Sequence, residues 1–129
     1  NRLYEYKTYG RVNMKEAASF FKVLADEARL KMLWLLFNRQ ELCVCDFMAV
    51  LEITQSKASR HLRILFNAGL VTDRRAGLWV YYALRPAADD SVRTYLETLK
   101  VILSARREAF ELLKKLEVWL AQKDQTSCK

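Results

Sequence analysis

Two cysteines separated by a single residue are the side chains of this chain with the clearest chemical potential. They are Cys43 and Cys45, in the segment ELCVCDFM. Thiolates are nucleophiles and ligands of soft metal ions, and a close pair of thiols can also oxidise to a disulfide. The chain has one more cysteine, Cys128, and three cysteines are too few for a disulfide framework. We therefore expect these residues to act as thiols.

A second group of chemically useful side chains follows Thr54, in the segment QSKASRHLRILFNAGL. At 3.6 residues per turn, a helix here turns four residues inward: Ala58, Leu62, Leu65 and Phe66. Six polar residues take the outward positions: Gln55, Ser56, Ser59, Arg60, Arg63 and Asn67. Gln and Arg can pair with base edges in the major groove, and Ser can contact bases or phosphates. This face predicts DNA binding, and the alternative is an ordinary solvated helix face.

These side chains need a scaffold, and the pattern around them predicts a helix-turn-helix. Only three glycines and one proline interrupt the chain, which favours a mainly helical fold. Apolar spacing predicts a helix over residues 11–24 and a second one capped by Asp26. We expect Asp46 to cap a short helix and Thr54 to cap the next one, which ends at Gly69. Residues 46–69 then form the helix-turn-helix, with the thiols just before it.

Residues 70–84 change to the alternating pattern of a β-hairpin, which predicts a wing. Arg74 and Arg75 lie near its tip, where they could reach the DNA backbone or minor groove. Residues 88–123 then run without glycine or proline, so we expect one long helix. A helix about 50 Å long exceeds what one small domain covers. The apolar stripe that includes Leu99 and Leu103 is therefore expected to form a homodimer together with residues 11–24.

The fold class predicted for residues 1–129 is a single winged helix-turn-helix domain, mainly α with a small β-hairpin. Lys and Arg number 22 against 15 Asp and Glu, a formal net charge of +7 that suits a phosphate-binding protein. No apolar run reaches the roughly 18 residues of a membrane span, and no signal-peptide core is present, so we expect a cytoplasmic protein with no membrane partner. No nucleophilic triad or phosphate-binding loop indicates an enzyme. The only histidine, His61, is expected to pack or contact phosphate.

From about Met14 to Leu103 the chain resembles the ArsR/SmtB family of winged-helix metal-sensing repressors, and within it the arsenical-resistance repressors. Four segments carry the resemblance: LADEARLKMLWLL, ELCVCDFMAVL, TQSKASRHLRILFNAGLV and DRRAGLWVYYAL. The resemblance implies a homodimer on operator double-stranded DNA that leaves when As(III) or Sb(III) binds Cys43 and Cys45.

The resemblance has one gap, which concerns the third ligand. Relatives that bind through this segment carry another cysteine three residues after the second, where this chain has Met48, and residues 1–42 contain no cysteine. As(III) favours three thiolates. The third ligand is therefore Cys128, a small-molecule thiol or hydroxide. A zinc site of the family's other branch is excluded because the last helix lacks histidine.

The spacing of the two thiols also predicts a mechanism. Side chains at i and i+2 lie ~200° apart on a helix, so they share one ion only where the backbone is not helical. Ligation is then expected to distort the start of the helix-turn-helix, whose helix N-terminus should lower the thiol pKa. Three alternatives stay open: a thiol-redox switch, a repressor responding to soft metals such as Cd or Pb, and an architectural or protein-binding module with incidental thiols.

Overall fold

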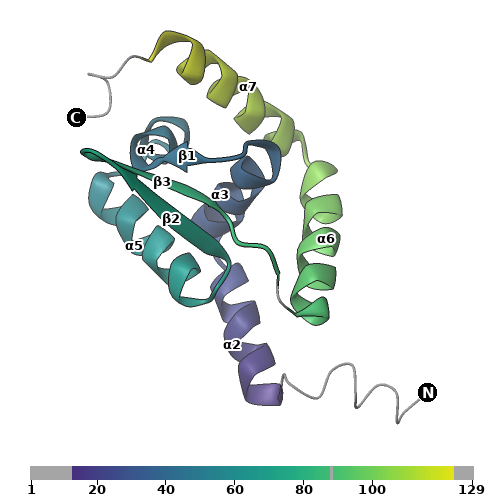
Figure 1. The fold of residues 1–129 in the computed structure, drawn as a ribbon. Coiled ribbons are helices and arrows are strands. Elements are labelled where there is room, and N and C mark those ends of the chain that lie inside the picture. The colour runs from purple at the N-terminus through teal and green to yellow at the C-terminus, as the bar shows by residue number, and fades with distance from the viewer. Residues whose placement is uncertain (1–12, 88, 124–129) are drawn as a thin grey trace.

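The computed structural model of the chain describes residues 13–87 and 89–123. Six helices and a three-stranded antiparallel sheet follow one another in this part of the chain (Figure 1). In chain order they are α2 (Met14–Leu24), α3 (Glu27–Asn38), β1 (Leu42–Cys43), α4 (Val44–Leu51), α5 (Gln55–Asn67), β2 (Val71–Ala76), β3 (Trp79–Leu84), α6 (Asp90–Ser104) and α7 (Arg107–Gln122). The predicted fold class is confirmed. Residues 11 and 12 of the predicted first helix lie outside the described residues.

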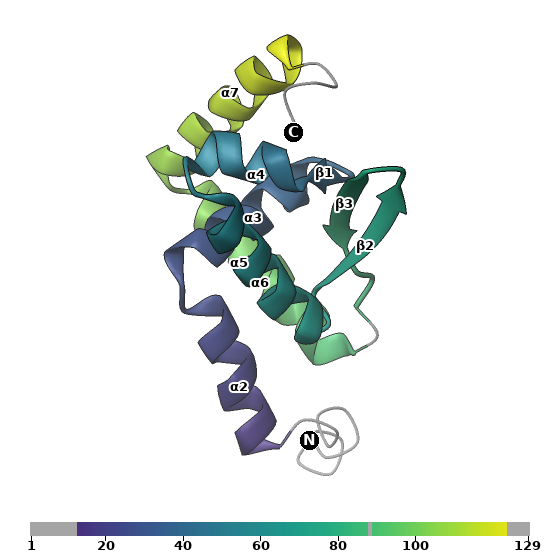
Figure 2. The same cartoon turned by 90° about the vertical axis from the view of Figure 1, so that its left-hand side faces the viewer.

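The hydrophobic core forms around α3, which lies among α4, α5, α6 and α7 in both views (Figures 1 and 2). Its side chains Met32, Leu33 and Leu35 are fully buried. Phe47 of α4 and the pair Leu62 and Leu65 of α5 join the same cluster. Both helices of the helix-turn-helix are therefore anchored on one side, and α5 keeps its other side for solvent or a ligand.

Side-chain caps set the starts of two helices as predicted. The Arg29 N–H donates to Asp26 at 3.1 Å, and the Lys57 N–H donates to Thr54 at 3.2 Å. The prediction for Asp46 is wrong, because α4 begins at Val44 and has Cys43 as its N-cap. Asp46 instead lies in the first turn and accepts a hydrogen bond from the Cys43 N–H at 2.7 Å.

The sheet has one strand more than the two-stranded wing that the sequence pattern predicted. β2 and β3 form the expected hairpin, with Gly77 at a φ of +62° in the turn. The two-residue strand β1 adds to the other edge of β3 and places Cys43 opposite Tyr81. Two residues are too short to show an alternating pattern, so periodicity gave no sign of β1. This strand joins the wing directly to the thiol segment.

The single long C-terminal helix is the second wrong prediction. The helix ends at Ser104, and Arg106 adopts an extended backbone with φ −94° and ψ 140° before α7 begins. α7 then folds back over α3 and α4 (Figure 1), where Leu116 is 2% exposed. The Trp34 indole N–H also donates to the Ala109 carbonyl at 2.8 Å. Burial of the α7 apolar face outweighs continuation of the helix.

The break changes which residues remain for a dimer interface. Leu99 and Leu103, the residues expected in the interface, pack against the core of their own chain. Val101 and Ile102 of α6 are instead exposed, by 69% and 47%. Phe21 of α2, also half exposed, contacts α6 through Tyr95 at a ring-centroid distance of 5.1 Å.

Within residues 13–87 and 89–123, none of the helices combines the length and apolarity that crossing a bilayer requires.

Candidate nucleic-acid interface and thiol site

The two sulfur atoms of Cys43 and Cys45 lie 3.0 Å apart. Cys43 ends β1 with an extended backbone, φ −87° and ψ 158°, while Cys45 lies in the first turn of α4. This change from strand to helix brings the side chains of residues i and i+2 together, as the spacing argument required. Both residues are buried. The structure thus brings together the first two of the three candidate ligands.

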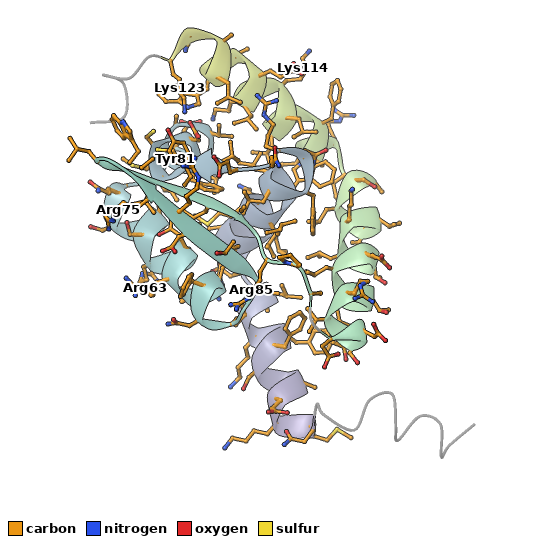
Figure 3. The ribbon with its side chains drawn as sticks, viewed as in Figure 1. Arg63, Arg75, Tyr81, Arg85, Lys114 and Lys123 are labelled. Carbon is orange, nitrogen blue, oxygen red and sulfur yellow. The ribbon has the colours of Figure 1, made fainter. Side chains whose placement is uncertain are left out.

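A buried carboxylate lies beside this pair and connects it to the C-terminal helix. Asp46 is 1% exposed and accepts hydrogen bonds from the Trp119 indole at 2.8 Å and from the Lys123 ammonium at 2.6 Å. Figure 3 shows Lys123, the residue that directly follows α7, near the C-terminal end of that helix. Sequence reasoning missed Trp119 and Lys123 because they are 73 and 77 residues from Asp46. Only the amphipathic pattern of α7 hinted at a packed face there.

The pKa of the Cys43 thiol shifts in the direction opposite to the prediction. Burial raises the pKa of the Cys43 thiol, and the Asp46 carboxylate adds to the rise. The Cys45 backbone N–H and the Lys123 ammonium act in the opposite direction without reversing it. The expectation that the helix N-terminus lowers this pKa is therefore wrong in its net direction, because desolvation of the thiolate dominates.

The donor set fits a soft ion that takes two thiolates from this segment. An ion about 2.3 Å from each sulfur holds two thiolates roughly 3.3–3.8 Å apart, so the pair needs to open only slightly. In the described part of the chain, no three or more His, Cys, Asp or Glu residues are grouped to hold a metal ion. Cys128, the candidate third ligand, lies outside the described residues.

The outward face of α5 has the predicted composition. Gln55, Ser56, Ser59, Arg60, Arg63 and Asn67 are all exposed, whereas Ala58, Leu62 and Leu65 are fully buried. Phe66 is the exception among the residues predicted to face inward, since it is 36% exposed. Leu65 occupies the inward position, and Phe66 is rotated about 100° away from it.

The two wing arginines have different surroundings. The Arg74 guanidinium donates to Glu41 at 2.5 and 3.2 Å and lies 4.8 Å from the centroid of the Tyr81 ring. Arg75 lies with Arg63 of α5 on the same side of the molecule (Figure 3). Arg74 is thus held by an acidic partner, while Arg75 of the wing and Arg63 of α5 place two cationic side chains on one side of the molecule.

Tyr82 of the wing is a partly buried tyrosine that sequence reasoning missed. Burial raises the pKa of Tyr82, and the Asp73 carboxylate adds to the rise. The guanidinium groups of Arg63 and Arg75 both oppose this rise. The pKa of Tyr82 therefore depends on charges of α5 as well as charges of the wing.

His61 is a packing residue, as one of its two predicted roles required. Its Nδ1 lies 3.0 Å from an Arg29 guanidinium nitrogen and 3.8 Å from Asp26. Burial lowers the pKa of His61, and the Asp26 carboxylate only partly offsets this effect. A neutral His61 accepts the Arg29 hydrogen bond and ties α5 to the start of α3.

A helix-turn-helix whose second helix has an exposed polar face beside a two-stranded wing defines a winged helix-turn-helix protein. Comparisons with known proteins agree with this class. The sequence profile described as "Bacterial regulatory protein, arsR family" matches residues 26–73, which cover α3, α4, α5 and the start of the wing.

Three relatives show how far the similarity extends. The arsenic resistance transcriptional regulator ArsR1 of Pseudomonas putida is 44% identical over 88 residues, 68% of this chain and 66% of the relative. The arsenical resistance operon repressor of Escherichia coli is 52% identical over 66 residues, 51% of this chain and 56% of the relative. A cadmium resistance transcriptional regulatory protein CadC homolog of Staphylococcus aureus is 37% identical over 103 residues, 80% of this chain and 81% of the relative.

Solved structures support the same assignment. The transcriptional repressor BigR of Xylella fastidiosa aligns with a TM-score of 0.61 at 26% identity, covering 72% of this chain and 88% of BigR. A homodimeric winged helix-turn-helix DNA-binding domain of Mycobacterium bovis aligns with a TM-score of 0.58 at 28% identity, covering 73% of this chain and 83% of that domain.

The chain belongs to the ArsR family of bacterial regulatory proteins. Its match spans 66% and 56% of the lengths of the Pseudomonas and Escherichia relatives. The family and these relatives are transcriptional regulators rather than enzymes.

Proposed function

We propose that this protein is a homodimeric repressor that binds operator double-stranded DNA and leaves it when As(III) or Sb(III) binds Cys43 and Cys45. The observation that carries the proposal is the pair of sulfur atoms 3.0 Å apart at the first turn of the helix-turn-helix. Arsenic-resistance regulators and repressors among the relatives support the choice of metalloid. Such a protein acts where the DNA is, in the cytoplasm.

The proposed DNA contacts come from α5 and the wing. Base contacts are assigned to Gln55, Ser56, Ser59, Arg60 and Arg63, and phosphate or minor-groove contacts to Arg74 and Arg75. These α5 side chains are exposed, and Gln55 and Ser56 lie at the N-terminus of the helix, which favours phosphate. The Glu41 contact weakens the case for Arg74, because binding phosphate would require breaking that ion pair.

The proposed coupling runs through α4. Metalloid binding moves Cys43 relative to Cys45, and Cys43 is both the N-cap of α4 and part of the strand beside β3. Since α4 is the first helix of the helix-turn-helix, its movement shifts α5 relative to the second subunit. Half-sites about one DNA turn apart tolerate little movement, and ~1–3 kcal/mol of coupling changes operator occupancy several-fold or more.

Three groups could supply the third arsenic ligand: Cys128, a small-molecule thiol or hydroxide. The contact of Lys123 with Asp46 places the end of α7 beside the thiol segment of the same subunit. Cys128 follows five residues after Lys123, and a chain of five residues spans at most about 17 Å. This reach supports Cys128 of the same subunit over Cys128 of the second subunit.

The proposed dimer uses α2 and α6. An open groove of about 890 Å³ between α2, α5 and α6 is lined by Phe20, Val23, Ile64, Val92 and Tyr95, among others. Phe21 of α2 contacts Tyr95, which lines this groove, and Val101 and Ile102 are exposed apolar side chains further along α6. A helix pair from a second copy would cover both, as the homodimeric Mycobacterium neighbour suggests.

Ile102→Glu and Phe21→Glu are each expected to give monomers, because a buried unpaired carboxylate costs several kcal/mol. Sedimentation velocity measures the change in mass. Val118→Glu is the matched control, since Val118 is an exposed apolar residue on α7, away from this surface. An unchanged mass in both variants would place the dimer interface elsewhere.

Release of operator DNA tests the proposed function directly. A duplex selected from a random library by this protein is labelled, and its anisotropy is followed while As(III), Sb(III), Cd(II), Pb(II) or peroxide is added. We expect release by As(III) and Sb(III) at concentrations where the other agents have no effect. Release by Cd(II) or Pb(II) alone would favour the soft-metal alternative, which the CadC homolog supports, and release by peroxide alone would favour a redox switch. Absence of DNA binding would reject all three.

A further inference from the structure

The C-terminal half of α7 contacts α4 at both ends of α4, and the two helices run in opposite directions. Lys115, in the middle of α7, forms an ion pair with Glu52 at the C-terminal end of α4. Trp119, about one turn further along α7, and Lys123, directly after its end, donate hydrogen bonds to Asp46 in the first turn of α4. The helix that carries Cys45 is therefore held along its length by a segment outside the residues that match the family profile.

Asp46 joins these contacts to the thiol site through its two oxygen atoms. Oδ2 accepts the Cys43 N–H at 2.7 Å, while Oδ1 accepts the Trp119 and Lys123 hydrogen bonds. The Asp46 side chain is 2% exposed, so solvent cannot replace a lost donor without rearrangement. The position of this carboxylate, and with it the Cys43 backbone, depends on donors supplied by α7.

We propose that Trp119 and Lys123 are positioning residues of the thiol site, which act through Asp46 to keep Cys43 and Cys45 converged for a trivalent arsenical. This inference rests on the proposed function, because it assumes that the two sulfurs bind the arsenical. The Cys43 N–H bond holds the N-cap backbone in its extended form, and that backbone brings the sulfurs to 3.0 Å. Removing a donor from Asp46 frees the N-cap and lets the sulfurs diverge before ligation.

Loss of a positioning residue changes the affinity of a metal site even though that residue does not touch the metal. Groups that hold ligand residues in place without touching the metal typically change metal affinity by ~10–100-fold when they are removed. Asp46 and its two α7 donors have this relation to Cys43. Glu52 and Lys115 do not, because they meet at the opposite end of α4.

Phenylarsine oxide is the probe for the test, because it binds two thiols and needs no third one. The protein is first reduced with a phosphine, which is then removed, so that both cysteines enter the titration as thiols. The oxygen of the arsenical is replaced by two sulfur atoms, and the two thiol protons leave with that oxygen as one water. We expect Trp119→Phe and Lys123→Gln each to weaken binding by ~10-fold or more. Lys123→Arg should restore most of the affinity, since it keeps a cationic donor. Lys114→Gln is the matched control, because Lys114 faces Phe110 on the outer side of α7.

Thermal unfolding and DNA binding without arsenical are measured on the same variants. Binding of phenylarsine oxide by Trp119→Phe and Lys123→Gln as tightly as by the parent would overturn the inference, even with a lowered unfolding temperature, because the two residues would then serve stability alone. Failure of Lys123→Arg to recover affinity would overturn the role of the cationic donor. Parent-like binding by Cys43→Ser would instead reject the thiol site, and with it the proposed function.

Discussion

Replacing Cys43 or Cys45 by serine is expected to leave a folded protein that binds operator DNA and no longer releases it when As(III) is added. A single remaining thiolate cannot chelate the ion, and a serine hydroxyl is a hard ligand that does not replace a soft thiolate. The parent should lose DNA affinity by about 5–150-fold on binding As(III), the range of ordinary coupling energies, and each variant should show no change. Fluorescence anisotropy of a labelled operator measures the difference.

Serine is small enough to occupy the buried position of either cysteine, so operator affinity without As(III) serves as the internal control. Parent-like release in either variant would contradict the proposed site. Cys128→Ser, titrated without added thiol, then identifies the third ligand. A large loss of As(III) affinity would assign it to Cys128, and an unchanged affinity would leave an external thiol or hydroxide.

The second large effect is expected from the arginines of α5. Arg60→Ala and Arg63→Ala should each weaken operator binding by ~1–3 kcal/mol, and by much less for an unrelated duplex, because a bidentate base contact is lost. Arg75→Ala should weaken both duplexes similarly and reduce the salt slope by about one, as loss of a phosphate contact does. Titrations at several salt concentrations separate the two behaviours.

Arg74→Ala is the matched comparison within the wing. Its guanidinium is held by Glu41 and the Tyr81 ring, so its removal should have a smaller effect than removal of Arg75. Lys114→Ala, on the outer face of α7, should have none. Operator affinity that is unchanged in Arg60→Ala, Arg63→Ala and Arg75→Ala would move the DNA interface away from α5 and the wing.

Local patterns were sufficient to predict most of the helix-turn-helix and the wing. The Asp26 and Thr54 caps, the inward Ala58 and Leu62 and the exposed polar residues of α5 depend on neighbours a few positions away. Capping and amphipathic spacing act over such short distances, so the sequence records them directly. For Cys43 and Cys45 the spacing predicted only a condition, that they can share an ion where the backbone is not regular helix, and the extended backbone of Cys43 meets it.

The start of α4, the break after Ser104 and the pKa of Cys43 depended on contacts between distant segments. α4 begins early because its N-cap Cys43 pairs with β3, almost forty residues later, and donates its N–H to Asp46 in the first turn. The segment at residues 105–106 contains neither glycine nor proline, and the break there is stabilised by burial of Leu116 and the Trp34 contact.

The residues around the thiols show the same division. The pair itself could be identified from the sequence, because only one residue separates Cys43 from Cys45. Its surroundings could not, because Trp119 and Lys123 reach Asp46 only after α7 has folded back over α4. Burial of an amphipathic face is a property of the whole folded chain, and it decided both the position of α7 and the desolvation that raises the pKa of Cys43.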